Sequence, residues 1–311
     1  MASINDSKNQ QKIQYMNEVI IAGADIGGSH ITAALVDIVT GDIIINTRKR
    51  REINADKNAE EILSAWSSLI KESFKAINRM PTELGIAMPG PFDYANGISY
   101  IKDQNKYDAL YGLNVKEKLA EKLGISADGI TILNDAACFL QGEIFGGAGK
   151  GYNRVIGLTL GTGLGAAWSL DGETEDADLW CSAYKDGIAE DYLSTRWFLK
   201  RYIEISGKAV KNVKELSARF TVDPFVREVF NEFGINLAGF LIPLIKKEKL
   251  QVVVLGGNIA LAFTFFSYSL QAAFDKENIK IEIRTSALGE NAALIGAASN
   301  HYLSSGTLDL K

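Results

Sequence analysis

Residues 19–44 read VIIAGADIGGSHITAALVDIVTGDII, and residues 154–173 read RVIGLTLGTGLGAAWSLDGE. Each stretch has an apolar run, a glycine-rich turn, a second apolar run and a Gly/Asp turn, which is the pattern of a β-hairpin. An offset of 134 residues places Asp25 over Thr159, Gly27 over Gly161 and Asp37 over Asp171. Because the strand lengths and the turns repeat together, the sequence predicts two related halves.

Strand and helix patterns follow each hairpin. ITILND (130–135) reads as a buried strand that ends at two polar residues, and VVVLGGN (252–258) as a buried strand followed by a turn. Helical patterns occur at 62–77, 115–123, 190–202, 225–244 and from 290 onward. This order, given twice, predicts an α/β protein of two similar domains with a cleft between them. We expect an N-terminal domain over 1–130, with 290–311 packing back on it, and a C-terminal domain over 131–289.

The composition limits the classes of function. Lys and Arg number 33 against 38 Asp and Glu, which gives a net charge of −5, so we expect no nucleic-acid partner. The two cysteines, Cys138 and Cys181, make neither a disulfide framework nor a thiolate zinc site by themselves. The first 18 residues lack the apolar core of a secretory signal, and polar residues interrupt the uncharged stretch 251–274. We therefore expect a cytoplasmic protein with no membrane span.

The turn GTGLGA (161–166) has two interpretations. It matches the dinucleotide fingerprint G-x-G-x-x-G/A, but that motif needs a helix directly after the glycines, and AAWSLDG predicts a strand. A hairpin bend that exposes Gly and Thr amides can instead bind terminal phosphates. The bend at 25–29 is similar but carries Asp25, a carboxylate that suits Mg²⁺, through water, better than bare phosphate. Neither bend contains Lys or Arg. Ordinary hairpin turns remain the alternative for both bends.

Several motifs together resemble one family. DIGGS (25–29), Asn134-Asp135, GLTLGTGLGAA (157–167), VVVLGGN and ALGENAALIGAA (287–298) resemble the ROK family of sugar kinases and repressors, in the actin-like ATPase superfamily. The resemblance runs from about Glu18 to His301 and implies duplicated actin-like, ribonuclease H-like ATPase domains with an interdomain cleft. The family's repressors carry a helix-turn-helix segment before the first phosphate loop. Only 24 residues precede Asp25 here, which favours the kinase branch.

The resemblance implies roles in catalysis and nucleotide binding. Asp135 corresponds to the general base that accepts the proton of the sugar hydroxyl, although an Asp at this place is also a common helix N-cap. Asp25 would bind Mg²⁺ through water. ATP would contact the two bends and the turn after 252–255, for which a plain strand-to-helix turn is the alternative. The nucleotide-binding residues implied are Asp25, Gly27, Gly28, Ser29, Gly161, Thr162, Gly163, Gly256, Gly257 and Asn258.

The sugar-binding residues follow from the same resemblance. They are Gly90, Asn105, Asn134, Glu175, Asp178 and Glu190, where Asp178 occupies the position of the family's metal-binding and sugar-binding His. For Glu190 the alternative is a solvated acid at the start of a helix.

The family's zinc segment, C-x-C-G-x-x-G-C-x-E, is only partly present. Cys181, Gly187 and Glu190 match it, but Ala183 and Ile188 replace two thiolates, so we expect no structural zinc site. We expect Cys181 to be a small buried residue, and packing by Trp180, Tyr184 and Ile188 to support the segment instead of a metal. Glu143 and Lys185 are interpreted as ordinary surface charges.

The sequence therefore predicts an ATP-dependent, Mg²⁺-requiring kinase of a hexose, glucokinase-like and homodimeric, that acts on a small-molecule sugar. The alternative is a catalytically weak, sugar-sensing ROK-type regulator without a DNA-binding domain. An NAD-dependent oxidoreductase rests on GTGLGA alone. Glucose, N-acetylated hexosamines, fructose and allose differ by single hydroxyl contacts, so the sequence does not name the sugar.

Overall fold

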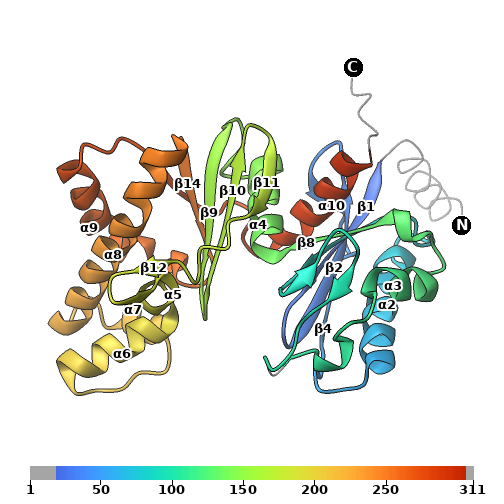
Figure 1. The fold of residues 1–311 in the computed structure, drawn as a ribbon, viewed down its shortest axis with the longest axis horizontal. Helices are drawn as coiled ribbons and strands as arrows, with labels where there is room; N and C mark the ends of the chain where they lie inside the picture. The colour runs from blue at the N-terminus through green and yellow to red at the C-terminus, as the bar shows by residue number, and fades with distance from the viewer. Residues whose placement is uncertain (1–18, 105, 306–311) are drawn as a thin grey trace, which may run out of the picture. The chain divides into compact units, whose positions relative to one another are not determined.

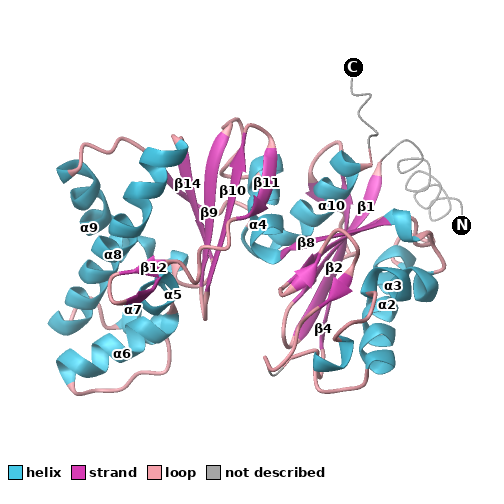
Figure 2. Cartoon of the chain, viewed as in Figure 1, coloured by secondary structure: helices cyan, strands magenta, loops and turns pink. Residues whose placement is uncertain are grey.

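The computed structural model describes residues 19–104 and 106–305, which form two compact α/β units. Unit 1 consists of the described residues up to Asn134 and those from Ala293 onward, and unit 2 is Asp135–Ala292. The chain thus passes from unit 1 to unit 2 after Asn134 and returns after Ala292, a few residues beyond the expected limits at 130 and 289. Figures 1 and 2 show that each unit has a sheet with helices packed against it.

Unit 1 is built on a six-stranded sheet of order β3-β2-β1-β5-β8, in which β4 also pairs with β2. Strand β1 is antiparallel to β2 and parallel to β5, and β5 is parallel to β8. The strands are β1 (Ile20–Ile26), β2 (His30–Asp37), β3 (Asp42–Ile43), β4 (Lys49–Glu52), β5 (Leu84–Met88) and β8 (Ile130–Asn134). A separate pair, β6 (Phe92–Asp93) and β7 (Ile98–Ser99), lies between β5 and β8 in sequence.

The two faces of β1 pack against different helices. Its even-numbered residues, such as Ala22, Ala24 and Ile26, join the apolar core that includes helix α2. On the other face, a Cβ at Gly23 or Gly85 would overlap the backbone of helix α10, so these glycines allow a close approach of helix and sheet. The helices of this unit are α2 (Ala59–Lys75), η1 (Asp108–Leu110), α3 (Val115–Leu123), η2 (Ala127–Gly129) and α10 (Ala292–Ser304), whose first residue belongs to unit 2.

Unit 2 repeats the same sheet. Its order is β11-β10-β9-β14-β15, with β9 antiparallel to β10 and parallel to β14, and β14 parallel to β15. The strands are β9 (Arg154–Leu160), β10 (Leu164–Leu170), β11 (Glu173–Asp176), β14 (Val252–Gly256) and β15 (Glu282–Thr285). The offset of 134 residues maps Ile20–Ile26 of β1 onto Arg154–Leu160 of β9. The predicted α/β class and the predicted duplication are confirmed.

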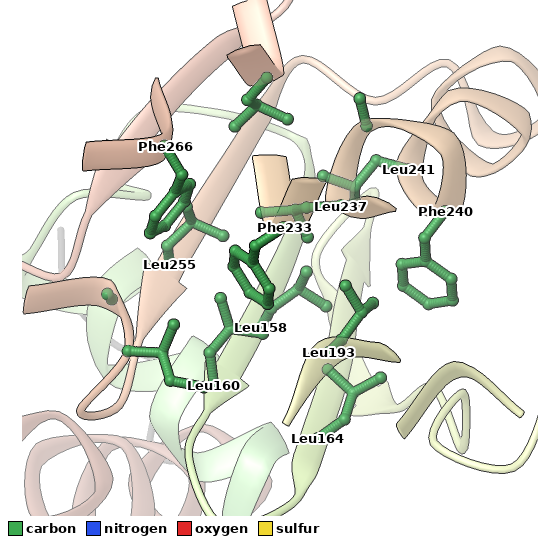
Figure 3. Packing of buried hydrophobic residues seen from close by; sticks show 14 of the residues in the cluster. Leu158, Leu160, Leu164, Leu193, Phe233, Leu237, Phe240, Leu241, Leu255 and Phe266 are labelled. Carbon is green, nitrogen blue, oxygen red and sulfur yellow. The ribbon is translucent and has the colours of Figure 1, made fainter. Parts of the chain in front are cut away.

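The helices of unit 2 enclose a large apolar core. Figure 3 shows Leu158, Leu160 and Leu255 from the sheet packed beside Phe233 of α8 and Phe266 of α9. The helices are α4 (Asp135–Gly146), α5 (Ala189–Leu193), α6 (Thr195–Ser206), α7 (Val213–Ala218), α8 (Pro224–Glu248), η3 (Ala260–Ala262), α9 (Phe263–Lys276) and η4 (Gly289–Asn291). A two-stranded sheet of β12 (Ala183–Tyr184) and β13 (Gly187–Ile188) precedes α5.

The helix predicted over 190–202 is wrong as a single element. Ser194 has extended backbone angles, with φ −120° and ψ 168°, and separates α5 from α6. The amide of Thr195, freed by this break, donates to the carbonyl of Gly161 at 2.8 Å. Helix periodicity continues across the break because both helices bury one face, so the sequence pattern did not reveal it.

Helix α8 is long and apolar enough to cross a membrane by length and composition, and no other helix in 19–104 and 106–305 passes that test. More than half of its apolar window is buried in the protein, where Phe230, Phe233 and Leu237 join the core of unit 2. A buried core helix accounts for this composition. The uncharged stretch 251–274 contains β14, a turn and part of α9, as predicted.

Two glycines of α4 provide a matched test of the packing in unit 2. A Cβ at Gly142 would overlap the carbonyl of Ala292, whereas a Cβ at Gly146, one turn later, would meet no atom within 4 Å. Gly142→Ala should therefore lower the free energy of unfolding by about 1–3 kcal/mol, because packed backbone must move. Gly146→Ala should leave it unchanged or slightly higher, since Ala favours helix. Denaturant titration of both variants makes the comparison, and equal effects would contradict the packing described.

Candidate active site

The first glycine bend, residues 27–29, joins β1 to β2 at the end of the sheet. The amide of Gly27 donates to the carbonyl of His30 at 2.9 Å, directly after the strand pair Ile26 and Ile31. A Cβ at Gly27 or Gly28 would come no closer than 3.6 Å or 3.5 Å to another residue, which is ordinary contact, and neither glycine has a positive φ. The fold therefore does not require glycine at either position. Their missing side chains leave the backbone open to another group.

The second glycine bend, residues 161–163, joins β9 to β10 in the same way. The amide of Gly161 donates to the carbonyl of Gly163 at 3.0 Å, and a Cβ at Gly161 would meet no atom within 4 Å. Gly163 differs, because its Cβ would lie 2.5 Å from Oε2 of Glu190. Strand β10 follows the bend, where a dinucleotide-binding fold would have a helix. The dinucleotide interpretation of GTGLGA is therefore wrong.

Glu190 supports the second bend. Its Oε2 accepts the amide of Leu164 at 3.0 Å, its Oε1 accepts from the guanidinium of Arg196, and its side chain is 19% exposed. The alternative of a solvated acid at a helix start is therefore wrong. A role of Glu190 in sugar binding stays a prediction. Arg196 was missed because an arginine on a helix carries no motif.

The turn Gly256-Gly257-Asn258 lies against the second bend. The amide of Ile259 donates to the carbonyl of Leu160, the residue before the bend, at 3.0 Å. Gly257 has φ +81°, and a Cβ on it would overlap this same carbonyl; a Cβ at Gly256 would overlap the ring of Phe139. Both glycines are thus required by the fold, which supports the strand-to-helix turn. The adenosine-binding role stays a prediction that depends on position rather than on the missing side chains.

Asp25 lies one residue before the end of β1, half-buried, opposite Thr32 of β2 and beside Ala87 of β5. Basic side chains gather beside the first bend. Nε2 of His30 lies 3.1 Å from Nη2 of Arg50, and the aliphatic chain of Lys106 passes Gly28. Neither Arg50 nor Lys106 is near the bend in sequence, so the local motif gave no sign of them.

Asn134, Gly90 and Tyr94 form a polar group at the end of β8. Asn134 is 8% exposed, and its Nδ2 donates to the hydroxyl of Tyr94 at 3.2 Å. This hydroxyl donates to the carbonyl of Met88 at 3.1 Å and would lie 3.3 Å from a Cβ at Gly90. The structure thus brings Asn134 and Gly90 together through Tyr94, which the sequence analysis missed. Asn105 lies outside the described residues.

Asp135 is the first residue of α4, is exposed, and accepts the amide of Ala136 at 2.8 Å through Oδ1. Partial desolvation raises the pKa of Asp176 on β11, and the carboxylates of Asp178 and Asp135 raise it further. The amide of Asp178 donates to Oδ1 of Asp176 at 2.9 Å. Asp135 and Asp178 therefore share a neighbourhood in which Asp176, missed by the sequence analysis, is the common member. The helix-capping alternative for Asp135 stays open.

Glu175 lies apart from this group. It stands opposite Trp168 across the β10–β11 pair, and its Oε1 accepts the indole N–H at 2.8 Å. Because neighbouring residues of a strand point to opposite faces, Glu175 and Asp176 lie on different faces of β11. The structure thus does not bring Glu175 together with Asp135.

The segment that resembles the zinc motif is held by polar contacts. The hydroxyl of Tyr184 donates to the carbonyl of Asn236 at 2.8 Å, and Nζ of Lys185 donates to its side-chain oxygen at 2.5 Å. Lys185 is therefore more than an ordinary surface charge. Trp180 is 47% exposed and Cys181 is also exposed, so the expectation of a buried Cys181 is wrong. Cys181 lies in a surface turn, closed by the bond from the Ser182 amide to the Leu179 carbonyl.

Glu143 is not a surface charge either. Its side chain is fully buried, and its two carboxylate oxygens accept four hydrogen bonds, from the hydroxyl of Ser286 and from the amides of Ala148, Ala287 and Leu288. A buried carboxylate requires such partners. Across 19–104 and 106–305, no three or more His, Cys, Asp or Glu side chains are grouped so that they could hold a metal ion.

A pocket of about 760 Å³ lies elsewhere in unit 2, between α6 and α8. Its lining includes Arg196, Arg201 and Glu232 but none of the residues predicted for phosphate or sugar binding. Its charges pair with each other, as in the contact of Arg201 with Glu232 at 2.7 Å. It is not the site assembled above.

A duplicated sheet of this order, with a glycine bend in the first hairpin of each copy, defines the actin-like ATPase fold. The model of the ROK family matches residues 21–177, half of the chain, and the chain belongs to the ROK family.

Its relatives include kinases and repressors. It is 25% identical over 262 residues to N-acetylgalactosamine kinase AgaK of Shewanella sp. (strain ANA-3), covering 76% of this chain and 81% of the kinase. It is 24% identical over 311 residues to the xylose repressor of Bacillus spizizenii, covering 90% of this chain and 77% of the repressor. A ROK family glucokinase from Streptomyces griseus, solved in complex with glucose and AMPPNP, has the same fold, with a TM-score of 0.71, 20% identity, and coverage of 91% of this chain and 99% of that one.

Gly161 offers the cleanest test of the bends. Because a Cβ there meets nothing within 4 Å, Gly161→Ala should unfold at the same denaturant concentration as the wild-type chain. If backbone amides of the bend bind phosphate, the added methyl group should raise the Kd for Mg·ATP by about tenfold or more, the equivalent of losing one charge-assisted hydrogen bond. Calorimetric titration measures this. Unchanged affinity would assign the bend to an ordinary turn.

Proposed function

We propose that the chain is an ATP-dependent sugar kinase that transfers the γ-phosphate of ATP to a hydroxyl of a hexose. The observation that carries this proposal is the pair of glycine bends, whose residues Gly27, Gly28 and Gly161 the fold itself does not require. Small residues at hairpin bends leave amide donors accessible to phosphate oxygens. The kinases among its relatives support this proposal.

Asp135 is the proposed general base. Its place, directly after β8 and beside the buried amide of Asn134, puts a carboxylate next to a group that can hydrogen-bond a sugar hydroxyl. It would accept the hydroxyl proton as the oxygen attacks the γ-phosphorus. The acidic surroundings, Asp176 and Asp178, oppose the accumulation of further negative charge on this side.

Asp25 fits a magnesium role. Mg²⁺ is commonly bound by one or two carboxylates together with phosphate oxygens and water, and Asp25 is a half-buried carboxylate beside the first bend. When bound, Mg²⁺ would neutralise phosphate charge. His30, Arg50 and Lys106 would add positive charge at the same bend.

The proposed sugar contacts are Asn134, Gly90 and Glu190, with Asp178 in the place of the family's His. We propose no particular hexose, because single hydroxyl contacts decide among them. A homodimer in the cytoplasm remains part of the proposal.

A second candidate is a sugar-sensing regulator. The similarity to the xylose repressor and the incomplete zinc segment favour it. Incubating the purified chain with Mg·ATP and a panel of hexoses, and measuring ADP release, separates the two. Sugar-dependent ADP release that stops in excess EDTA supports the kinase; sugar binding without turnover supports the regulator.

Asp135→Asn should lower kcat by about 10²- to 10⁴-fold, because general-base assistance is worth that much, while sugar and ATP still bind. Asp128→Asn, at an exposed position on the turn before β8, is the matched control and should leave kcat unchanged. If Asp135 only caps α4, Asn serves equally well as a cap, and kcat would stay within about twofold. Steady-state kinetics and thermal unfolding of both variants decide between the roles.

A further inference from the structure

Tyr107 reaches the first glycine bend from a distant part of the sequence. Its side chain is fully buried, and its ring meets that of Trp66 edge to face with centroids 5.1 Å apart. Its amide donates to the carbonyl of Ala55 at 3.2 Å, and its hydroxyl donates to the carbonyl of Gly27 at 2.6 Å. The residue is thus fixed at its backbone, its ring and its hydroxyl.

The bond to Gly27 fixes more than one atom. The carbonyl of Gly27 and the amide of Gly28 belong to one planar trans peptide unit, in which C=O and N–H point in opposite directions. With the carbonyl turned toward buried Tyr107, the N–H of Gly28 must point away from it, on the side where the exposed Gly28 meets solvent. Gly28 has a great deal of conformational freedom, so without this bond the peptide unit could rotate.

The hydroxyl remains a donor over the relevant pH range. Burial raises the pKa of Tyr107 to about 12, and the nearby charge of Asp25 acts in the same direction. The phenol is therefore protonated at neutral pH. The Gly27 carbonyl has a permanent partner, and the amide of Gly28 makes no hydrogen bond to any residue in the described part of the chain.

We propose that Tyr107 is a positioning residue for nucleotide binding, which holds the Gly27–Gly28 peptide unit so that the Gly28 N–H is presented to a phosphate oxygen. The proposal rests on the proposed function in that the phosphate belongs to ATP. Tyr107 itself touches no substrate. Its segment also follows Asn105, the position assigned to sugar by resemblance, by two residues, so sugar and phosphate contacts share one stretch of chain.

Tyr107→Phe removes the hydroxyl and keeps the ring against Trp66. The Kd and the KM for Mg·ATP should rise about 3- to 10-fold, the effect of one neutral hydrogen bond, while the KM for sugar stays within about twofold. In the nucleotide-free chain, hydrogen exchange of the amides of Gly27 and Ile53, which bond within and onto the bend, should accelerate by a similar factor.

The matched control is Tyr202→Phe. Tyr202 is also fully buried, and its hydroxyl donates to Asp223 at 2.8 Å in unit 2, away from the bend. This variant should lose comparable stability but leave ATP affinity and the exchange of Gly27 unchanged. If Tyr107→Phe behaves like Tyr202→Phe in every readout, Tyr107 is only structural and the proposal is overturned.

The readouts separate failure of the inference from failure of the proposed function. Wild-type chain that binds Mg·ATP but releases no ADP with any sugar would contradict the kinase, while the Kd and the exchange rates would still test Tyr107. Wild-type chain that binds no ATP would overturn both. Normal turnover together with an unchanged ATP Kd in Tyr107→Phe would overturn the role of Tyr107 alone.

Discussion

In each unit a three-residue bend between two central strands is held by one side chain from outside the hairpin. In unit 1 the hydroxyl of Tyr107 bonds to the carbonyl of Gly27, and in unit 2 the carboxylate of Glu190 bonds to the amide of Leu164. A bend of small residues has many accessible conformations, and an external hydrogen bond selects one of them. The proposed nucleotide binding depends on this selection, because amides can act as preorganised donors only if their peptide planes are fixed.

The glycines of the chain divide into two kinds, and the division carries the functional argument. Gly23, Gly85 and Gly142 are needed by the fold, since a Cβ at each would overlap the backbone of a neighbouring element. Gly27 and Gly161 stand in equivalent bends and meet no such obstacle. Glycine lowers stability where nothing requires it, so its presence at both bends points to a group that approaches the backbone from outside.

The sequence was sufficient to predict the fold, because hairpin signals and the repeat are local patterns. It also placed Asp135 and Asn134 at the end of one strand and distinguished the bend at 161–163 from a dinucleotide loop. Contacts between distant segments were beyond it. Tyr107 and Arg196 meet the bends through tertiary packing, and nothing in their own neighbourhoods marks them. Glu143 was misjudged for the same reason: its four donors come from residues that follow it by 5 or by more than 140 positions. Glu175 and Asp176 show that an alignment off by one residue in a strand selects the opposite face.

The central claim is that the amides of both glycine bends bind the phosphates of ATP. Hydrogen exchange of the wild-type chain, measured at residue resolution with and without saturating Mg·ATP, tests it most directly. The account predicts slower exchange at residues 27–29 and at residues 161–163 in the same titration. Slowing confined to one bend, or absent from both while ATP is bound, would contradict it.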